Sequence, residues 1–217
     1  MQSFLFGHTQ TGLPIMGYRF GNSGPKVLVL GGVHGDEIEG VWAANGLLSS
    51  VQKKYDLNLQ LVIVPMFNLD GILMKERRNA SKIDLNRNLP TKDFTSVAAT
   101  ERYFPGHTAN SEAENQALVS YLEKEKPKFI LSLHSYKPML NYNGDCKIEA
   151  EVISKHTGYI VTDSIGYPTP GSLGTYAGVE LNIPTLTYEV ERGLDQASVM
   201  KQVPAIIDGL RSAERFA

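Results

Sequence analysis

The sequence contains a single cysteine, Cys146, among its 217 residues, so it cannot form an internal disulfide. This excludes a small secreted scaffold held together by disulfides. The sequence also has no large surplus of charge of either sign. Its 21 Lys and Arg nearly balance its 23 Asp and Glu, which gives a formal net charge of −2. Without a basic excess, neither nucleic acid nor an anionic membrane surface is an expected partner.

Long hydrophobic runs are absent too. The longest, Val27–Leu30 and Leu59–Met66, are far shorter than the roughly 20 residues that a membrane-spanning helix requires. The N-terminus shows neither the basic segment nor the apolar stretch of a signal peptide. We therefore expect a cytoplasmic protein, with residues 1–217 forming one domain. No repeat, heptad or sustained apolar stripe indicates an assembly, so the oligomeric state stays open.

Apolar strand-like runs alternate with helical spacing along the chain. This alternation predicts an α/β fold with a mixed, mainly parallel sheet and helices on both faces. Six strands are expected, at Phe4–Phe6, Ile15–Phe20, Val27–Leu30, Leu59–Pro65, Phe129–Leu133 and Thr185–Tyr188. Helices are expected at residues 37–51, at residues 111–126, at Ile148–His156 and at Gln196–Arg215.

Local signals refine this pattern. Ser111 and Glu114 have the spacing of a capping box at a helix start, and Pro204 predicts a kink or a restart in the last helix. The glycines at positions 31, 32 and 35 are expected to turn the chain sharply and to leave space for a ligand. Residues 90–110 have no periodicity, and so long a loop is usually functional or mobile.

Polar residues follow the apolar strands, and ligands in such sheets lie beyond the carboxyl ends of the strands. His34 and Glu37 have the spacing i, i+3, which places both side chains on one face of a helical turn. His134 follows another strand and is the best third candidate. Imidazole and carboxylate both suit zinc, and two His with one Glu leave a coordination position open for water. A surface His–Glu pair and a core histidine are the alternatives.

Four motifs occur in order between residues 31 and 189: Gly31-Gly-Val-His34-Gly-Asp-Glu37, Asp84-Leu-Asn86-Arg87-Asn88, Leu133-His134-Ser135-Tyr136 and Thr187-Tyr-Glu189. Together they resemble the zinc carboxypeptidases of the carboxypeptidase A clan. The resemblance implies a single-domain carboxypeptidase-like fold with an eight-stranded sheet, and one Zn²⁺ per chain held by His34, Glu37 and His134. It also implies a peptide substrate with a free C-terminal carboxylate.

The resemblance assigns further roles. Asp84 matches the carboxylate that accepts the far N–H of the first zinc histidine, which fixes the orientation of the ring. Asn86 and Arg87 match the pair that holds the substrate carboxylate. Arg77 matches the arginine that stabilises the developing oxyanion, although a slip of one residue would give this role to Arg78.

Glu189 matches the general base, which takes a proton from water and passes it to the leaving amine. A pairing of Glu189 with Arg192 is the alternative. Tyr167 matches a mobile tyrosine that covers the substrate, with Tyr176 as a rival. Because no covalent intermediate is needed, Cys146 and the serines need not act as nucleophiles.

Two segments, Arg77–Pro90 and Ile165–Gly178, are most similar to those of the bacterial murein peptide amidases. Those cytoplasmic enzymes cut the γ-D-glutamyl–diaminopimelate bond of recycled wall peptides. Leu173 or Gly174 lies near the position that sets side-chain preference, and neither is charged. The alternatives are an N-acyl amino acid hydrolase of the aspartoacylase and succinylglutamate desuccinylase group, a general metallocarboxypeptidase, a tubulin-tail deglutamylase, and a metal-dependent binding module without catalysis.

Overall fold

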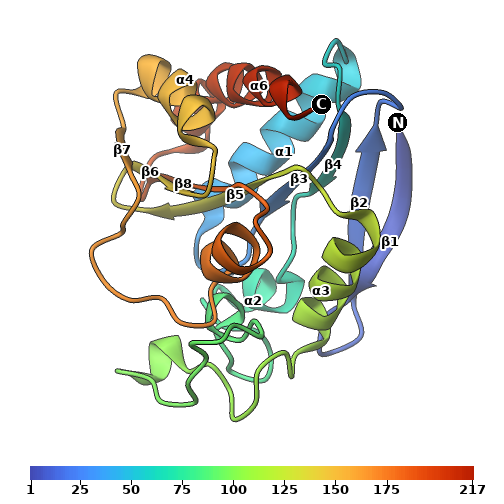
Figure 1. Cartoon of the computed structure of the whole chain (residues 1–217). Helices are drawn as coiled ribbons and strands as arrows, with labels where there is room; N and C mark the ends of the chain where they lie inside the picture. The colour runs from blue at the N-terminus through green and yellow to red at the C-terminus, as the bar shows by residue number, and fades with distance from the viewer.

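Eight strands form one sheet in the order β1-β2-β4-β3-β5-β8-β6-β7 in the computed structural model, which describes all residues from 1 to 217 (Figure 1). The strands are β1 (Gln2–His8), β2 (Pro14–Phe20), β3 (Lys26–Gly31), β4 (Gln60–Val64), β5 (Phe129–Tyr136), β6 (Met139–Asn143), β7 (Ile160–Thr162) and β8 (Thr185–Glu191). The helices are α1 (Ile38–Lys53), α2 (Leu69–Met74), α3 (Ala113–Glu125), α4 (Lys147–Thr157), α5 (Gln196–Met200) and α6 (Val203–Ser212).

The four central strands, β4, β3, β5 and β8, are parallel to one another. Their apolar sequences suit strands that are buried on both faces. Antiparallel pairs flank them, with β1 on β2 and β2 on β4 at one side and β6 on β8 at the other. The predicted mixed, mainly parallel eight-stranded sheet is therefore confirmed.

Helices cover both faces of the sheet (Figure 1). One core joins the sheet to α1, α4, α5 and α6, and a second core joins the opposite face to α3 and the π-helical segment η3 (Gly174–Glu180). None of these helices combines the length and the apolar content needed to cross a bilayer. The two layers of helices hold the central strands rigidly, so side chains at their carboxyl ends have fixed positions.

The structure departs from the sequence-based expectations in several places. Strands β6 and β7 and the segment η3 were not predicted. The prediction of a capping box is wrong. The Ser111 hydroxyl donates to Glu112, and the Glu114 carboxylate accepts from Gln10 and Asn79. Pro204 is the second residue of α6, where its missing N–H costs no helical hydrogen bond, so it starts a new helix. Residues 90–110 contain only one short 3-10 turn, η2 (Glu101–Tyr103).

Candidate metal centre and active site

The three strands β3, β5 and β8 carry the predicted site residues to the same edge of the sheet. Gly31 at the end of β3 lies beside Leu133 of β5, and His134 of β5 lies beside Glu189 of β8. Parallel strands end at a common edge, so residues that are far apart in the sequence meet there. This edge holds the candidate active site.

A tight loop between β3 and α1 carries His34 and Glu37. Gly32 adopts a φ of +69°, which favours glycine. A Cβ atom at Gly35 would lie 2.0 Å from the carbonyl carbon of Gly71 in α2. The expectation that glycine leaves space for a ligand is wrong at this position, because the α2 backbone fills it. Glycine here brings α2 close and holds the loop rigidly.

His34, Glu37 and His134 point their ligand atoms at one place, and all three side chains are buried. The Glu37 carboxylate lies 2.9 Å from Nδ1 of His34 and 2.8 Å from Nδ1 of His134. The two Nδ1 atoms are 3.1 Å apart. Zn–N bonds of about 2.0–2.1 Å at tetrahedral angles place two ligand nitrogens roughly 3.3 Å apart. The donor set and its spacing therefore fit a zinc ion.

The far nitrogens of both rings have their own partners. Nε2 of His34 lies 3.1 Å from Oδ1 of Asp84, and Nε2 of His134 lies 2.9 Å from the hydroxyl of Ser132. These contacts turn both Nδ1 atoms toward the shared point, as partners of metal-binding histidines do. Ser132 was missed by the sequence analysis, although its position two residues before His134 on one strand puts both side chains on one face.

The carboxylates of Glu37 and Asp84 favour binding of a cation between the three ligand side chains. Burial acts to raise the pKa of Glu37, but His34 and His134 hold that pKa well below its usual range. Burial likewise opposes ionisation of Asp84, and Arg77 and His34 lower its pKa strongly. Both groups are therefore carboxylates at neutral pH, as metal ligands and their partners must be.

The structure places the side chains of Arg77 and Arg78 in different surroundings. Arg77 is buried, donates from Nε to Asp84 at 2.8 Å and from Nη1 to Glu37 at 3.1 Å, and borders the cavity above the metal ligands. Arg78 points elsewhere and pairs with Glu76. Only Arg77 is positioned to act on a group bound between His34 and Glu37.

Asn86 and Arg87 lie on the same cavity wall, just beyond Asp84. The backbone N–H of Asn86 donates to Asp84, and its side-chain oxygen accepts from the backbone N–H of Leu173. Arg87 is buried, yet no carboxylate pairs with it and its only protein acceptor is the carbonyl of Asn86. A buried guanidinium without an acidic partner is a ready site for a substrate carboxylate.

Glu189 borders the same cavity, and its Oε2 is buried without a hydrogen-bond partner. Burial raises the pKa of this carboxyl from an ordinary 4.5 to about 7. The alternative pairing with Arg192 is wrong, because Arg192 donates to Asp36 instead. An unpaired carboxylate with a pKa near neutrality is suited to accept and release a proton.

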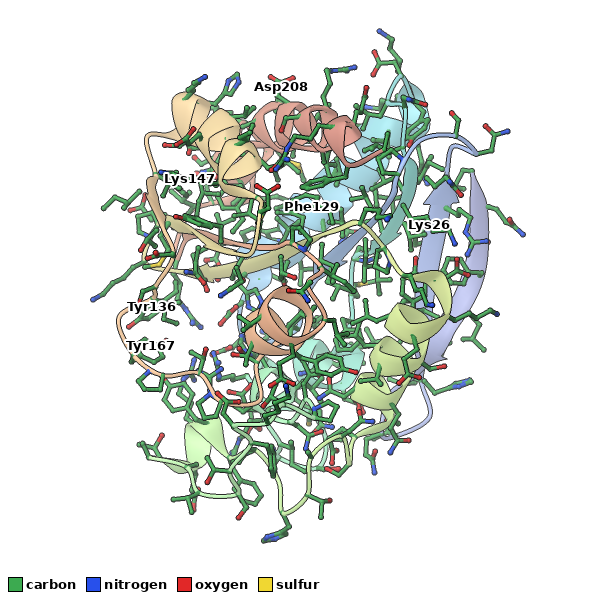
Figure 2. The ribbon with its side chains drawn as sticks, in the orientation of Figure 1. Lys26, Phe129, Tyr136, Lys147, Tyr167 and Asp208 are labelled. Atoms are coloured by element: carbon green, nitrogen blue, oxygen red, sulfur yellow. The ribbon has the colours of Figure 1, made fainter.

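The cavity has a volume of about 310 Å³ and a mostly polar lining. Tyr167 and Tyr136, both labelled in Figure 2, border it. Tyr176 is buried in the core on the other face of its helix, so it is not a rival to Tyr167 as a cavity residue. Of the two positions considered for side-chain preference, Gly174 lines the cavity and Leu173 packs into the core.

A model of the zinc carboxypeptidase family matches residues 1–190 of the chain. Murein peptide amidase A from Vibrio campbellii is 28% identical over 217 aligned residues, which cover 93% of this chain and 84% of the relative. Murein peptide amidase A from Escherichia coli K12 is 29% identical over 177 residues, 75% of this chain and 69% of the relative.

Solved structures share the fold. The murein-tripeptide amidase of Escherichia coli O157 superposes with a TM-score of 0.82 at 23% identity, covering 97% of this chain and 92% of that one. Carboxypeptidase A of Helicoverpa armigera superposes with a TM-score of 0.85 at 18% identity, covering 99% of this chain and 68% of that one. At these identities the likeness shows the carboxypeptidase-like fold.

The chain thus belongs to the zinc carboxypeptidase family, with the single-domain α/β fold and the zinc ion that define the family. It is a hydrolase that acts on peptides, and the relatives similar to it in sequence are named murein peptide amidase A. The predictions of family, fold, enzyme class and zinc are confirmed.

Proposed function

We propose that this protein hydrolyses the γ-D-glutamyl–meso-diaminopimelate bond of the murein tripeptide L-Ala-γ-D-Glu-meso-diaminopimelate, in cytoplasmic recycling of wall peptides. Residues 1–217 form one catalytic domain in this proposal. The observation that carries it is a single cavity lined by His34 and Glu37 of the candidate zinc site, the unpaired carboxylate of Glu189 and the unpaired guanidinium of Arg87, with His134 in contact with Glu37. The relatives named murein peptide amidase A support the choice of substrate.

His34, Glu37 and His134 hold the metal in this mechanism. A bound zinc ion supplies a Lewis acid that polarises the scissile carbonyl and lowers the pKa of water. Glu189 takes a proton from the attacking water and passes it to the leaving amine. Arg77 donates to the oxyanion through Nη2, because its Nε and Nη1 already donate to Asp84 and Glu37.

Arg87 and Asn86 bind the terminal carboxylate of the substrate, and Tyr167 covers it. Tyr167 stands on the segment Ile165–Ser172, whose prolines at positions 168 and 170 restrict the backbone. The wall beyond it is polar, with Thr169, Ser172 and Asn143 around Gly174, and Asp163 also lines the cavity. Hydroxyl and amide groups of this kind accept the paired ammonium and carboxylate at the far end of diaminopimelate through hydrogen bonds.

The test is a panel of substrates for the zinc-loaded protein: the murein tripeptide, free γ-D-Glu-diaminopimelate, N-acetyl-aspartate, N-succinyl-glutamate, and peptides ending in Leu or Arg. We expect the highest kcat/KM for the tripeptide, since specificity is a ratio of these values. Preference for an N-acyl amino acid would establish an aspartoacylase-like activity. Preference for a Leu or Arg peptide would establish a general carboxypeptidase. No turnover, with and without added zinc, would establish a binding module.

A further inference from the structure

Asp36 lies between two arginines from distant parts of the chain. Its Oδ2 accepts from Nη2 of Arg102 at 2.7 Å and from Nη2 of Arg192 at 2.9 Å. The backbone carbonyl of Asp36 also accepts from Arg192, at 2.9 Å. Arg102 comes from the long loop of residues 90–110, and Arg192 follows β8. Both arginines line the active-site cavity, and we call the three residues the Asp36 cluster.

The Asp36 cluster carries a surplus positive charge. Asp36 is one carboxylate that pairs with two guanidinium groups, those of Arg102 and Arg192. Each arginine uses only Nη2 in these contacts, which leaves its Nε and Nη1 donors free of protein acceptors. The two arginine side chains are 45% and 39% exposed, whereas Asp36 is 14% exposed. The free donors are therefore accessible to a ligand from the cavity.

The Asp36 cluster lies close to the reaction site. Asp36 directly precedes the metal ligand candidate Glu37, so their Cα atoms are about 3.8 Å apart. Arg192 follows Glu189 by three residues on the segment that continues from β8. Arg87, which is proposed to bind the terminal carboxylate, is a separate group with no contact to Asp36. The cavity thus offers a second cationic position in addition to Arg87.

We propose that Arg102 and Arg192 bind the α-carboxylate that a γ-linked glutamate carries on the acyl side of the scissile bond. This inference rests on the proposed function and names the feature of the substrate that is selected. A γ-glutamyl residue keeps its α-carboxylate free, whereas an α-linked residue other than glutamate carries no carboxylate at that distance from the scissile carbonyl. Four carbon–carbon bonds separate this carboxylate from the scissile carbonyl, about 5 Å when extended.

Asp36 acts as a positioning residue in this proposal. Two bare guanidinium groups would repel each other, and the shared carboxylate holds them together in a fixed orientation. Each arginine then keeps N–H donors with which it can form a charge-assisted hydrogen bond to the same ligand carboxylate. The site therefore favours an acyl residue that carries a carboxylate at this distance, as a γ-linked glutamate does, over a residue that carries none.

The test compares the tripeptide with the same peptide in which D-isoglutamine replaces D-glutamate, so that an amide replaces the α-carboxylate. A hydrogen bond to a charged group contributes enough to predict a wild-type kcat/KM about 10–100-fold lower for the amide. Arg192→Gln and Arg102→Gln should lower kcat/KM for the tripeptide by a similar factor and leave the amide nearly unchanged. Arg192→Lys should restore part of the preference through its charge.

Arg211→Gln is the matched control, because Arg211 is an exposed arginine paired with one aspartate, Asp56, away from the cavity. It should retain the wild-type preference. A third substrate has lysine in place of diaminopimelate, so it lacks the carboxylate at the far end of the diaminopimelate side chain. The Arg192→Gln variant should show the same ratio of tripeptide to lysine peptide as wild type, which separates the α-carboxylate from the one on diaminopimelate.

Equal hydrolysis of the acid and the amide by wild type would overturn the inference and leave the proposed function intact. An equal loss for both peptides in Arg192→Gln would also overturn it, because a merely structural contact would lower both. If the zinc-loaded protein cleaves neither peptide but cleaves another member of the panel, the proposed function fails and the inference fails with it.

Discussion

Two walls of one cavity differ in how they are built. The strand-end wall (His34, Glu37 and Glu189, together with His134, which contacts Glu37) stands at the carboxyl ends of central parallel strands and is held by both hydrophobic cores. The loop wall (Arg87, Arg102, Tyr167 and Thr169) stands on segments outside the sheet, and Tyr167 is 46% exposed. A rigid sheet positions the reactive groups, whereas loops can change with little cost to the fold. In the proposed mechanism, the reacting groups therefore belong to the strand-end wall and most of the substrate contacts to the loop wall.

The largest expected effect comes from removing a metal ligand on the strand-end wall. In His134→Ala, the site keeps His34 and Glu37 but loses a third donor, so metal and activity should be lost together. Elemental analysis should show little zinc, and turnover should fall to that of chelator-treated wild type. His156→Ala is the control, because His156 is exposed and pairs with Asp208 outside the cavity. Full zinc occupancy in His134→Ala would remove His134 from the ligand set.

The next effect tests whether the strand-end wall also supplies the base. Glu189→Gln keeps the shape of the side chain and removes its basicity. Turnover should fall about 10²–10⁴-fold, the usual contribution of general acid–base catalysis, while zinc stays bound. The control is Glu191→Gln, an exposed carboxylate on the same strand. A kcat close to wild type in Glu189→Gln would show that another group moves the proton.

The contrast between the walls also explains what the sequence could predict. His34, His134 and Glu189 each follow or end an apolar run, so the position of a strand also gave the position of its polar residue. The four central strands were predicted for the same reason. Strand β6 was missed because two asparagines interrupt its apolar pattern and its pairing with β8 stabilises it. The segment η3 was missed because two glycines lower its helix propensity.

The contacts of the arginines around the cavity were harder to predict because they depend on the tertiary structure. Arg102 and Arg192 both reach Asp36 across long stretches of sequence, and no local spacing indicates such a pair. Arg192 is only three residues from Glu189, which made a pairing with Glu189 plausible until the structure showed Asp36 as its partner. Arg77 and Arg78 have the same local context, and only the fold turns one of them into the cavity.

A smaller effect is expected on the loop wall. Arg87→Gln removes the guanidinium that is proposed to bind the terminal carboxylate, and the loss of a charge-assisted hydrogen bond predicts a KM about 10–100-fold higher. Zinc content and kcat should change much less than in the strand-end variants. Arg87→Lys should recover only part of the loss, because an ammonium group lacks the planar fork. A fall in kcat with an unchanged KM would assign Arg87 to the chemical step.

The smallest expected effect is a pH-dependent change in the stability of the metal-free protein, which comes from Glu189 on the strand-end wall. Burial raises the pKa of Glu189 to about 7 from an ordinary 4.5, so the folded metal-free protein binds this proton more tightly than the unfolded chain does. The protonated Glu189 carboxyl therefore favours the folded state. This contribution to the free energy of unfolding is fully present below the ordinary pKa and is lost as the pH rises through about 7.

Glutamine cannot lose a proton, so metal-free Glu189→Gln should become more stable relative to metal-free wild type between about pH 5 and about pH 8. The change corresponds to about 5–10 degrees in Tm for a chain of this size, and denaturant unfolding at both pH values measures it. Glu191→Gln should follow wild type at both, because that carboxylate is exposed. If the difference between Glu189→Gln and wild type stays constant with pH, the pKa of Glu189 is the same in the folded and the unfolded protein, and burial on the strand-end wall does not bring it near neutrality.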